Sequence, residues 1–450
     1  MNLNSIHNVY FVGIGGIGMS AIARYFVSFG KNVAGYDKTP SQITDDLSDL
    51  GVQIHFDDVI KNIPISFLNT ENTLVIFTPA IPKNHSELMY FKENNFKVLK
   101  RAQVLGMISK NTFCLAVAGT HGKTTTSAIL GHIMKRVNAT SFLGGISENY
   151  NSNLLLGEDK ICVVEADEFD RSFLQLYPNI ACITSMDADH LDIYKEASSL
   201  EESFVTFSQQ VSETLIVAKG LPLKGLTYAV NETADYMAFN LKIESGKYIF
   251  DVKTPVSEIK NIEFHLPGKH NVMNALAALA MADSYGISLE EIKQCLATFK
   301  GVKRRFTYKI KTNDFVLIDD YAHHPTEIAA VQNAIREMYP NEKVLVVFQP
   351  HLFSRTQDFA DDFASALAAF DEILLLDIYP ARELPIPGVN GEWLLSKINN
   401  PHKKITQKKT LLKDIQQSSA KVVAMLGAGD IGVMISEITN QLLKTNQDEI

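Results

Sequence analysis

The chain has 450 residues, of which 46% are hydrophobic and 21% charged, and its formal net charge is -9. This length predicts roughly two to four domains, each large enough for its own core. The acidic balance argues against nucleic acid as a partner, because binding a phosphate backbone requires a basic face. The cysteines lie in apolar runs without close spacing, which indicates reduced core residues rather than disulfides or zinc ligands: Cys114, Cys162, Cys182 and Cys295.

The N-terminal residues show no basic segment followed by a long apolar one, so no secretory signal is predicted. No apolar run approaches the ~18–20 residues needed to cross a bilayer. We therefore expect a cytoplasmic protein without a membrane partner.

The first predicted domain, residues 1–108, opens with a strand at 9–12, a glycine-rich turn and a helix at 19–29. Further strands are expected at 32–36, 73–77 and 97–99. The turn has the Gly-x-Gly-x-x-Gly pattern of dinucleotide-binding domains, with the acid Asp37 about twenty residues later. Such a turn and the helix end that follows it can bind any diphosphate, and the acid can accept a hydrogen bond from a hydroxyl. The turn consists of Gly13, Ile14, Gly15, Gly16, Ile17 and Gly18.

The second predicted domain, residues 109–300, begins with an apolar strand that ends in a loop suited to phosphate. Its glycines let backbone N–H groups converge on an anion, and the following helix adds its positive dipole end. Lys123 is expected to reach the outer phosphates, and the Thr124 hydroxyl to bind Mg²⁺. Val117 stands where the full phosphate-loop pattern has a further glycine, so this is a shortened form. The loop residues are Gly119, Thr120, His121, Gly122, Lys123, Thr124 and Thr125.

Acidic residues follow two later strands of this domain, predicted at 161–164 and 180–184. Glu165 can join Thr124 on Mg²⁺, which prefers oxygen ligands. His190 lies among three aspartates and is a candidate ligand of a second metal ion. A surface acid and a solvated histidine are the plain alternatives for these two residues.

The rest of the second domain contains a β-rich stretch, 211–262, whose topology the pattern does not reveal, and two helices at 270–282 and 289–299. Asn271 and Asn274 share one face of the first helix at an i, i+3 spacing, and their amides can read a purine edge. Helix capping by Asn271 is the alternative.

The third predicted domain, residues 301–450, contains four buried strands alternating with helical stretches, which is typical of an open parallel sheet. They are expected at 315–318, 343–348, 372–376 and 422–426. A second Gly-x-Gly-x-x-Gly, residues 427–432, follows the last strand. Too little chain remains for a full binding unit, so we interpret it as a tight turn. Residues 403–409 are interpreted as solvated surface.

Ionisable residues follow two strands of this domain. Asp320 and His324 follow the first, and His351 and Arg355 follow the second. Such groups are rarely plain core residues, and the arginine suits a carboxylate ligand. Arg305 offers a cation for polyphosphate, with a basic linker as the alternative.

The motifs thus predict an α/β protein of three domains: a Rossmann-like N-terminal domain, a P-loop ATPase-like central domain and a Rossmann-like C-terminal domain. Phosphoryl transfer is the chemistry that they favour. A nicotinamide-dependent oxidoreductase built on 13–37 is an alternative, although it has no need of the Gly-Lys-Thr-Thr loop. A non-catalytic nucleotide-gated binding protein is another.

The motifs also occur in the order found in the Mur ligase family, which the chain resembles from end to end. The segments that carry this resemblance are 13–20, 119–126, 165–170, 189–192, 270–275, 304–306, 319–327 and 349–356. The opening Gly-Ile-Gly-Gly-Ile-Gly-Met-Ser and the later Asp-Asp-Tyr-Ala-His-His-Pro-Thr-Glu resemble in particular the members that join L-alanine to UDP-N-acetylmuramate.

The resemblance implies that ATP phosphorylates the lactyl carboxylate of UDP-N-acetylmuramate, and that the amine of L-alanine then displaces phosphate, in the synthesis of a peptidoglycan precursor. It implies that the phosphate loop holds ATP, with Thr124 and Glu165 on one Mg²⁺ and His190 on a second. Adenine would contact Asn271 and Asn274, the phosphates Arg305, and the ribose Asp320. The uridine diphosphate would lie on the turn of Gly13, Gly15, Gly16, Ile17 and Gly18 near Asp37, and the amino acid near His324, His351 and Arg355.

Three positions depart from the family pattern. Leu352 replaces a frequent second basic residue near the amino acid, and Phe56-Asp57 replaces a Gly-His pair near the uridine. Glu201 and Glu202 lie on the helix where relatives carry a carbamylated lysine, so we predict no such modification. Within the family, the alternative is a ligase that recycles a tripeptide onto the same sugar nucleotide. We expect a monomer or a weak homodimer.

Overall fold

The computed structural model describes residues 6–187, 197–244, 246–381 and 383–448. The chain forms two compact units, and each is described by itself. The first unit consists of Met1–Lys242, Ile249–Phe264 and Val272–Lys300, and the second of Ile243–Tyr248, His265–Asn271 and Gly301–Ile450. Among the described residues, no helix is both long and apolar enough to cross a bilayer.

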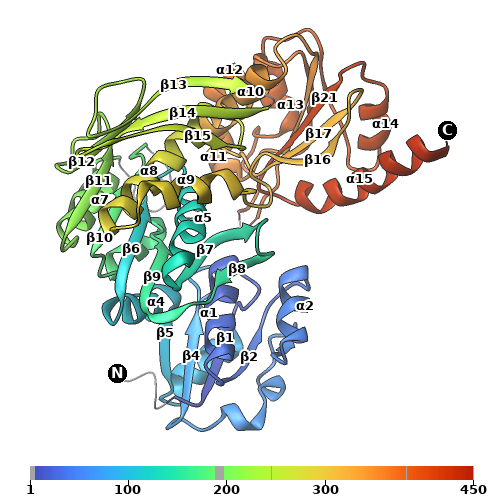
Figure 1. Cartoon of the computed structure of the whole chain (residues 1–450). Coiled ribbons are helices and arrows are strands. Elements are labelled where there is room, and N and C mark those ends of the chain that lie inside the picture. The colour runs from blue at the N-terminus through green and yellow to red at the C-terminus, as the bar shows by residue number, and fades with distance from the viewer. Residues whose placement is uncertain (1–5, 188–196, 245, 382, 449–450) are drawn as a thin grey trace. The chain divides into compact units, whose positions relative to one another are not determined.

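The first unit begins with a parallel sheet of order β3-β2-β1-β4-β5 (Figure 1). Side chains alternate between the faces of a strand, so a buried strand needs cover on both sides. Phe11 packs in one cluster with Ile22 and Val104, which lie on α1 and α4, while Tyr10 packs against Phe91 of α3 in the other. The elements are β1 (Asn8–Val12), α1 (Ile17–Ser28), β2 (Asn32–Tyr36), α2 (Gln42–Asp49), β3 (Gln53–His55), β4 (Thr73–Phe77), α3 (Ser86–Glu93), β5 (Lys97–Lys100) and α4 (Arg101–Lys110).

The second sheet has ten strands in the order β15-β14-β13-β12-β11-β10-β6-β9-β7-β8. Its strands are β6 (Phe113–Ala118), β7 (Ala139–Ser147), β8 (Ser152–Leu155), β9 (Glu158–Glu165), β10 (Ile180–Ile183), β11 (Thr214–Ala218), β12 (Leu226–Val230), β13 (Tyr236–Glu244), β14 (Lys247–Lys253) and β15 (Glu258–Phe264). The helices along this part of the chain are α5 (Lys123–Met134), α7 (Ala197–Gln209), α8 (Lys269–Tyr285) and α9 (Leu289–Thr298). The stretch 211–262, whose topology the sequence did not reveal, supplies β11 to β15.

Strand β6 is parallel to both of its neighbours, β10 and β9. The carboxyl ends of parallel strands meet at one edge of a sheet. The phosphate loop after β6, the acids after β9 and the residues after β10 are therefore brought together.

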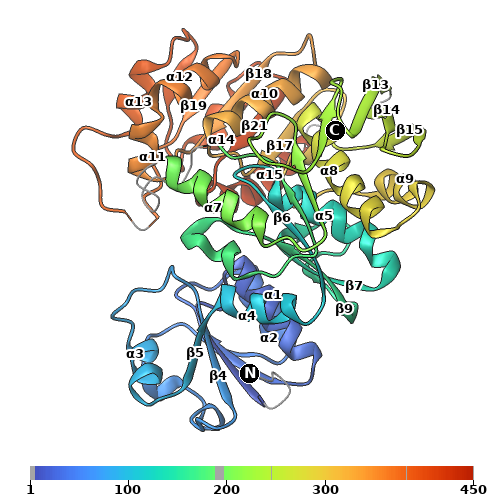
Figure 2. The same cartoon turned by 90° about the vertical axis from the view of Figure 1, so that its left-hand side faces the viewer.

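The second unit contains a six-stranded sheet of order β16-β17-β21-β18-β19-β20, in which only β16 is antiparallel to its neighbour. Helices α10, α12 and α13 contribute to the core on one face (Figure 2), and α14 and α15 on the other. The elements are β16 (Thr307–Lys311), β17 (Val316–Asp320), α10 (Pro325–Met338), β18 (Val344–Phe348), α11 (Phe353–Asp358), α12 (Ala360–Ala368), β19 (Glu372–Leu375), α13 (Gly391–Lys397), β20 (Lys403–Ile405), α14 (Leu411–Gln416), β21 (Val422–Leu426) and α15 (Ile431–Asp448).

The interpretation of residues 403–409 as solvated surface missed a short strand. Residues 403–409 are not merely solvated surface, because Lys403–Ile405 form β20 and pair with β19. The strand is at the edge of its sheet, where exposed lysines are common because they discourage pairing with other chains. The polar composition of β20 gave no strand pattern in the sequence.

Candidate functional site

The phosphate loop is held in shape by residues that follow β10. Gly119 and Gly122 have φ angles of +131° and +81°, and a Cβ atom on Gly119 would lie 2.1 Å from Thr184 Oγ1. The Thr184 hydroxyl donates to Ala118 O, and the backbone N–H of His121 donates to Ser185 Oγ at 2.8 Å. Both glycines are thus required by backbone conformation, and the first also by the close approach of a neighbouring strand end.

Lys123 begins α5 and points into a group of acceptors. Its Nζ donates to Gly119 O at 2.6 Å and lies 2.8 Å from Glu168 Oε2, and the Glu168 side chain is 1% exposed. Burial by itself would lower the pKa of Lys123, but the carboxylates of Glu168, Asp167 and Glu165 outweigh burial and raise this pKa above its usual value. Lys123 therefore carries a positive charge at the start of α5.

Two oxygen groups predicted to bind a metal do meet. The Thr124 hydroxyl donates to Glu165 Oε1 at 3.1 Å. This donor set, a hydroxyl and a carboxylate, fits the preference of Mg²⁺ for oxygen ligands. Among the described residues, no group of three or more His, Cys, Asp or Glu side chains forms a metal cluster. His190, the predicted ligand of a second ion, lies outside the described residues.

The two predicted adenine contacts on α8 differ in their surroundings. Asn274 Oδ1 accepts a hydrogen bond from Thr126 Oγ1 at 3.3 Å and lies 2.5 Å from the position of a Cβ atom on Gly122. Asn274 thus braces the phosphate loop. The Asn271 amide donates to Pro267 O at 2.6 Å, a carbonyl that precedes the helix. Contact of either residue with adenine stays a prediction.

The glycine turn of the first sheet is fixed by the acid predicted to accompany it. Gly13 has a φ of +92°, and the backbone N–H of Gly15 donates to Asp37 Oδ2 at 2.7 Å. A Cβ atom on Gly15 would lie 2.9 Å from the same oxygen. Asp37 holds the turn beside the start of α1 (Ile17–Ser28), so its first role is to shape the loop.

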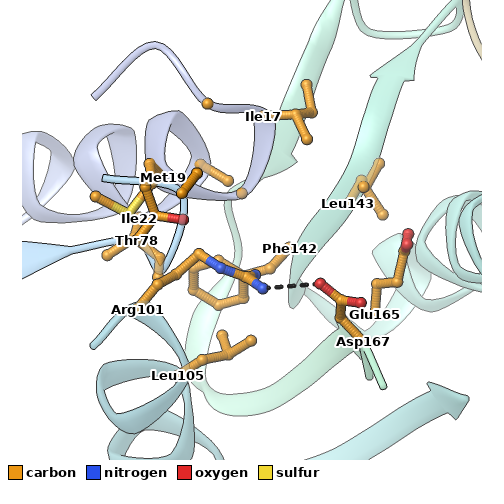
Figure 3. A pocket seen from close by; sticks show the side chains of 15 residues that line it. Ile17, Met19, Ile22, Thr78, Arg101, Leu105, Phe142, Leu143, Glu165 and Asp167 are labelled. Atoms are coloured by element: carbon orange, nitrogen blue, oxygen red, sulfur yellow. Dashed lines mark hydrogen bonds and ion pairs between the residues drawn. The ribbon is translucent and has the colours of Figure 1, made fainter. Parts of the chain in front are cut away.

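One cavity joins this turn to the acids of the second sheet (Figure 3). It has a volume of about 290 Å³ and is lined by Gly16, Ile17 and Gly18 on one side and by Glu165 and Asp167 on the other. Figure 3 shows Arg101 pointing toward Asp167, and Arg101 Nη2 donates to Asp167 Oδ2 at 3.2 Å. A ligand lying on the glycine turn can therefore extend to the carboxylate that meets Thr124.

In the second unit, the predicted site residues gather at the carboxyl ends of β17 and β18. Asp320 is buried, its carboxylate accepts hydrogen bonds from Phe306 N at 2.6 Å and Ala322 N at 2.7 Å, and burial raises its pKa to about 6. The Arg305 guanidinium lies 5.4 Å from the centre of the Tyr321 ring.

His324 caps the start of α10, where its Nδ1 accepts a hydrogen bond from Thr326 N at 3.4 Å. The ring of His351 lies 5.8 Å from that of Tyr379 in a stacked arrangement. Arg355 is buried near His323, whose pKa is lowered first by burial and further by the charge of Arg355. Imidazole rings and a cation thus meet at one edge of this sheet.

The second glycine pattern is a strand-to-helix turn between β21 and α15, as predicted. Arg304 Nη2 donates to Gly427 O at 2.5 Å, and Gln349 Oε1 accepts from Ile431 N at 3.0 Å. Side chains of this unit thus hold the turn closely.

Reasoning from the sequence gave no individual role to four residues that lie at these sites: Arg101, Asp167, Glu168 and His323. Asp167 and Glu168 follow the strand that ends in Glu165, and His323 adjoins His324, so their motifs were the available signals. Arg101 had no signal, because it lies 83 residues after Gly18 in the chain and reaches it only through the order of the sheet.

Models of one protein family match all three parts of the chain. They are described as "Mur ligase family, catalytic domain" over residues 8–112, "Mur ligase middle domain" over 117–282 and "Mur ligase, glutamate ligase domain" over 304–437.

Individual proteins match over nearly the whole length. A UDP-N-acetylmuramate--L-alanine ligase of Flavobacterium psychrophilum is 61% identical over 98% of this chain and 99% of its own. The crystal structure of a UDP-N-acetylmuramate-alanine ligase from Thermotoga maritima has a TM-score of 0.83 and 28% identity, covering 98% of this chain and 100% of its own. A MurF ligase from Thermotoga maritima, in complex with ADP, shares the fold with a TM-score of 0.63 at 16% identity, over 84% of this chain and 97% of its own.

Proposed function

Because this chain belongs to the Mur ligase family, we propose that it is the ATP-dependent ligase that joins L-alanine to UDP-N-acetylmuramate. The products are UDP-N-acetylmuramoyl-L-alanine, ADP and phosphate. The observation that carries this proposal is the cavity that runs from the Gly16–Gly18 turn to Glu165. It lets a sugar nucleotide on the turn present its carboxylate beside the phosphate loop.

The reaction consists of two transfers. The lactyl carboxylate attacks the γ-phosphorus of ATP and releases ADP, and the amine of L-alanine then attacks the acyl carbon and releases phosphate. The protein has little covalent chemistry to do, so its contribution is positioning and charge. Lys123 meets the negative charge of the outer phosphates, and Gly119 and Gly122 let the loop backbone approach them.

Thr124 and Glu165 are the residues that would hold Mg²⁺, with His190 as the proposed ligand of a second ion. When bound, the metal neutralises charge on the phosphates as it develops. In the second unit, Arg305 and Asp320 are proposed to contact the phosphates and the ribose of ATP.

The amino acid is proposed to lie near His324, His351 and Arg355. The guanidinium of Arg355 suits the α-carboxylate, which must be held while the amine attacks. We expect the enzyme to act in the cytoplasm as a monomer or weak homodimer, with no nucleic acid or membrane partner.

The test is a phosphate-release assay that supplies ATP, Mg²⁺ and UDP-N-acetylmuramate with a panel of amino acids. We expect release only when both the sugar nucleotide and L-alanine are present. Release that ignores both substrates would overturn the proposal. Release that requires a tripeptide instead of L-alanine would establish the recycling ligase, and tight binding of NAD without binding of uridine nucleotides would revive the oxidoreductase.

A further inference from the structure

Arg101 lies beside the glycine turn of the first sheet. It is the first residue of α4, directly after β5, and it lines the same cavity as Gly16 and Gly18 (Figure 3). A Cβ atom on Gly18 would lie 2.7 Å from Arg101 Nη1. The third glycine of this turn therefore leaves room for an arginine, in addition to any role in packing α1 on its sheet.

The charges that line the cavity require a cation if an anion is to enter. Glu165 and Asp167 contribute carboxylates, and Arg101 is the only Lys or Arg among the lining residues in the described part of the chain. A nucleoside diphosphate brings further negative charge. Like charges repel over several ångströms in a partly enclosed site, so backbone N–H groups of the turn would have to hold the diphosphate against this repulsion unless Arg101 takes part.

The guanidinium is available for such a role. Its hydrogen bond to Asp167 measures 3.2 Å, and the two side chains are 19% and 36% exposed. Partly exposed pairs of this kind contribute little free energy, so replacing the aspartate by a phosphate costs little. An arginine presents five N–H donors in a planar fork that matches two phosphate oxygens.

We propose that Arg101 binds the diphosphate of the sugar nucleotide beside the first turn of α1, and that its guanidinium exchanges Asp167 for phosphate oxygens when the ligand binds. The identity of the ligand rests on the proposed function. The inference adds a substrate-binding residue that the glycine pattern does not contain. It also explains why position 18 is glycine, since a side chain there would displace Arg101.

The test measures the dissociation constants of uridine, UMP and UDP for the whole chain by titration calorimetry, without turnover. In the unmodified protein we expect UDP to bind at least about tenfold more tightly than UMP. Arg101→Met should raise the Kd of UDP by about 10- to 100-fold and should leave the Kd of uridine within about twofold, because the change removes only contacts to phosphate.

Lys100→Met is the matched control. Lys100 precedes Arg101, has its own aspartate partner, Asp170, at 2.7 Å, and lines a neighbouring cavity instead of this one. The Kd of UDP should stay within about twofold of the unmodified value, since the removed charge is about half-exposed and screened.

Asp167→Asn separates ligand binding from a purely structural role for Arg101. If Arg101 only ties α4 to the segment after β9, losing either partner should weaken UDP binding equally, and the inference falls. If Arg101 binds the diphosphate, Asp167→Asn should leave UDP binding intact or tighten it, because a competing carboxylate is gone. Arg101→Lys keeps the charge and loses the fork, so it should raise the Kd of UDP by about three- to tenfold, and it carries the test if Arg101→Met does not fold.

The same titrations distinguish a failure of this inference from a failure of the proposed function. If the unmodified protein binds UDP and the Arg101 variants bind it equally well, Arg101 has no role at the diphosphate and the ligase proposal stands. If the unmodified protein binds no uridine nucleotide, both fall.

Discussion

The chain contains two strand-to-helix turns with the pattern Gly-x-Gly-x-x-Gly, and an arginine lies against the third glycine of each. A Cβ atom on Gly18 would lie 2.7 Å from Arg101 Nη1, and one on Gly432 would lie 2.4 Å from Arg304 Nη1. Both glycines are the second residue of the helix that follows, α1 or α15. In sequence and in local geometry, the two turns are close equivalents.

They differ in what the arginine does. Arg304 donates to Gly427 O at 2.5 Å and to Asp319 Oδ1 at 3.2 Å, so it closes its own turn from within. Arg101 makes no such bond to its turn among the contacts of the described residues; it pairs with Asp167 and lines a cavity. The same glycine pattern therefore borders an open cavity in one place and forms a filled corner in the other. Neighbouring elements decide between them.

The largest predicted effect is the loss of the lysine side chain in the phosphate loop. Lys123→Met should lower kcat/KM for phosphate release about 10³-fold, or about 4 kcal/mol, because a positioned charge on the transferring phosphate is lost. It should also lower the free energy of unfolding by about 3–5 kcal/mol, since the buried carboxylate of Glu168 loses its cation.

The double variant Lys123→Met/Glu168→Gln is the control for this effect. It removes both charges, so urea unfolding should show that most of the stability returns. Its turnover should remain low. Recovery of turnover in the double variant would mean that Lys123 has no role in catalysis.

Replacing the arginine that fills the 427–432 turn should instead lower the stability of the protein. Arg304→Met removes a donor from Gly427 O and from the buried Asp319, and should lower the free energy of unfolding of the second unit by about 3 kcal/mol. Arg101→Met should cost less than about 1 kcal/mol, because its ion pair is partly exposed. Urea unfolding of both variants provides the measurement. Equal losses in the two variants would remove the contrast between the turns.

The third glycines offer a sharper version of the same comparison. In Gly432→Ala the new methyl group meets an arginine held at two points, and overpacking should cost about 2 kcal/mol of unfolding free energy. In Gly18→Ala the methyl group can push Arg101 aside, so stability should change by less than about 1 kcal/mol while the Kd of UDP rises. Calorimetric titration and urea unfolding of the pair test both halves. If Gly432→Ala does not lower the free energy of unfolding, the turn accommodates a methyl group beside Arg304.

The last prediction concerns the dependence of stability on pH. Asp320, whose backbone carbonyl accepts from Gly427 N, has a pKa raised from 3.8 to about 6 by burial. Between these two values the folded state holds a proton that the unfolded state has lost. Stability should therefore fall as pH rises from about 4 to about 6, by at most about 1.4 kcal/mol per pH unit.

Asp320→Asn cannot titrate, so its unfolding free energy should lack this part of the pH dependence. Denaturant unfolding at several pH values from 4 to 7 provides the comparison. An identical slope in the variant and the unmodified protein would show that the carboxyl is ionised in the folded chain.

Much of the fold was predictable because its signals are local. Apolar runs that end in glycine marked β1, β6 and β21, and the helix after β1 was expected at 19–29, close to its observed position at Ile17–Ser28. Two short strands, β3 and β20, were not predicted, because three residues each are too few to show the alternation of apolar and polar residues typical of a strand. In β16, Tyr308 and Ile310 alternate with lysines at a sheet edge, and no apolar run results.

The site was predictable where one motif carries several of its groups. Lys123 and Thr124 follow directly from the loop pattern, and Glu165 follows from its place at the end of a buried strand, next to Thr124 in the fold. The two amides of α8 share a helix face, yet Asn274 braces the phosphate loop and Asn271 donates to Pro267 O, before the helix. Spacing placed these groups together but could not give each its partner.

The sequence by itself determined where backbone conformation must be special and which local groups accompany it, because glycine, lysine and threonine act within one turn of chain. Only the tertiary structure decided whether such a turn borders an open cavity or is filled by side chains. In the first sheet, β4 lies between β1 and β5, and this order brings Arg101 to Gly18 with a cavity between them and the acids. In the third, β21 enters between β17 and β18, so that Asp319 and Gln349 flank a turn already closed by Arg304. The physical reason is distance along the chain: contacts between residues tens of positions apart depend on strand order, which no local pattern records.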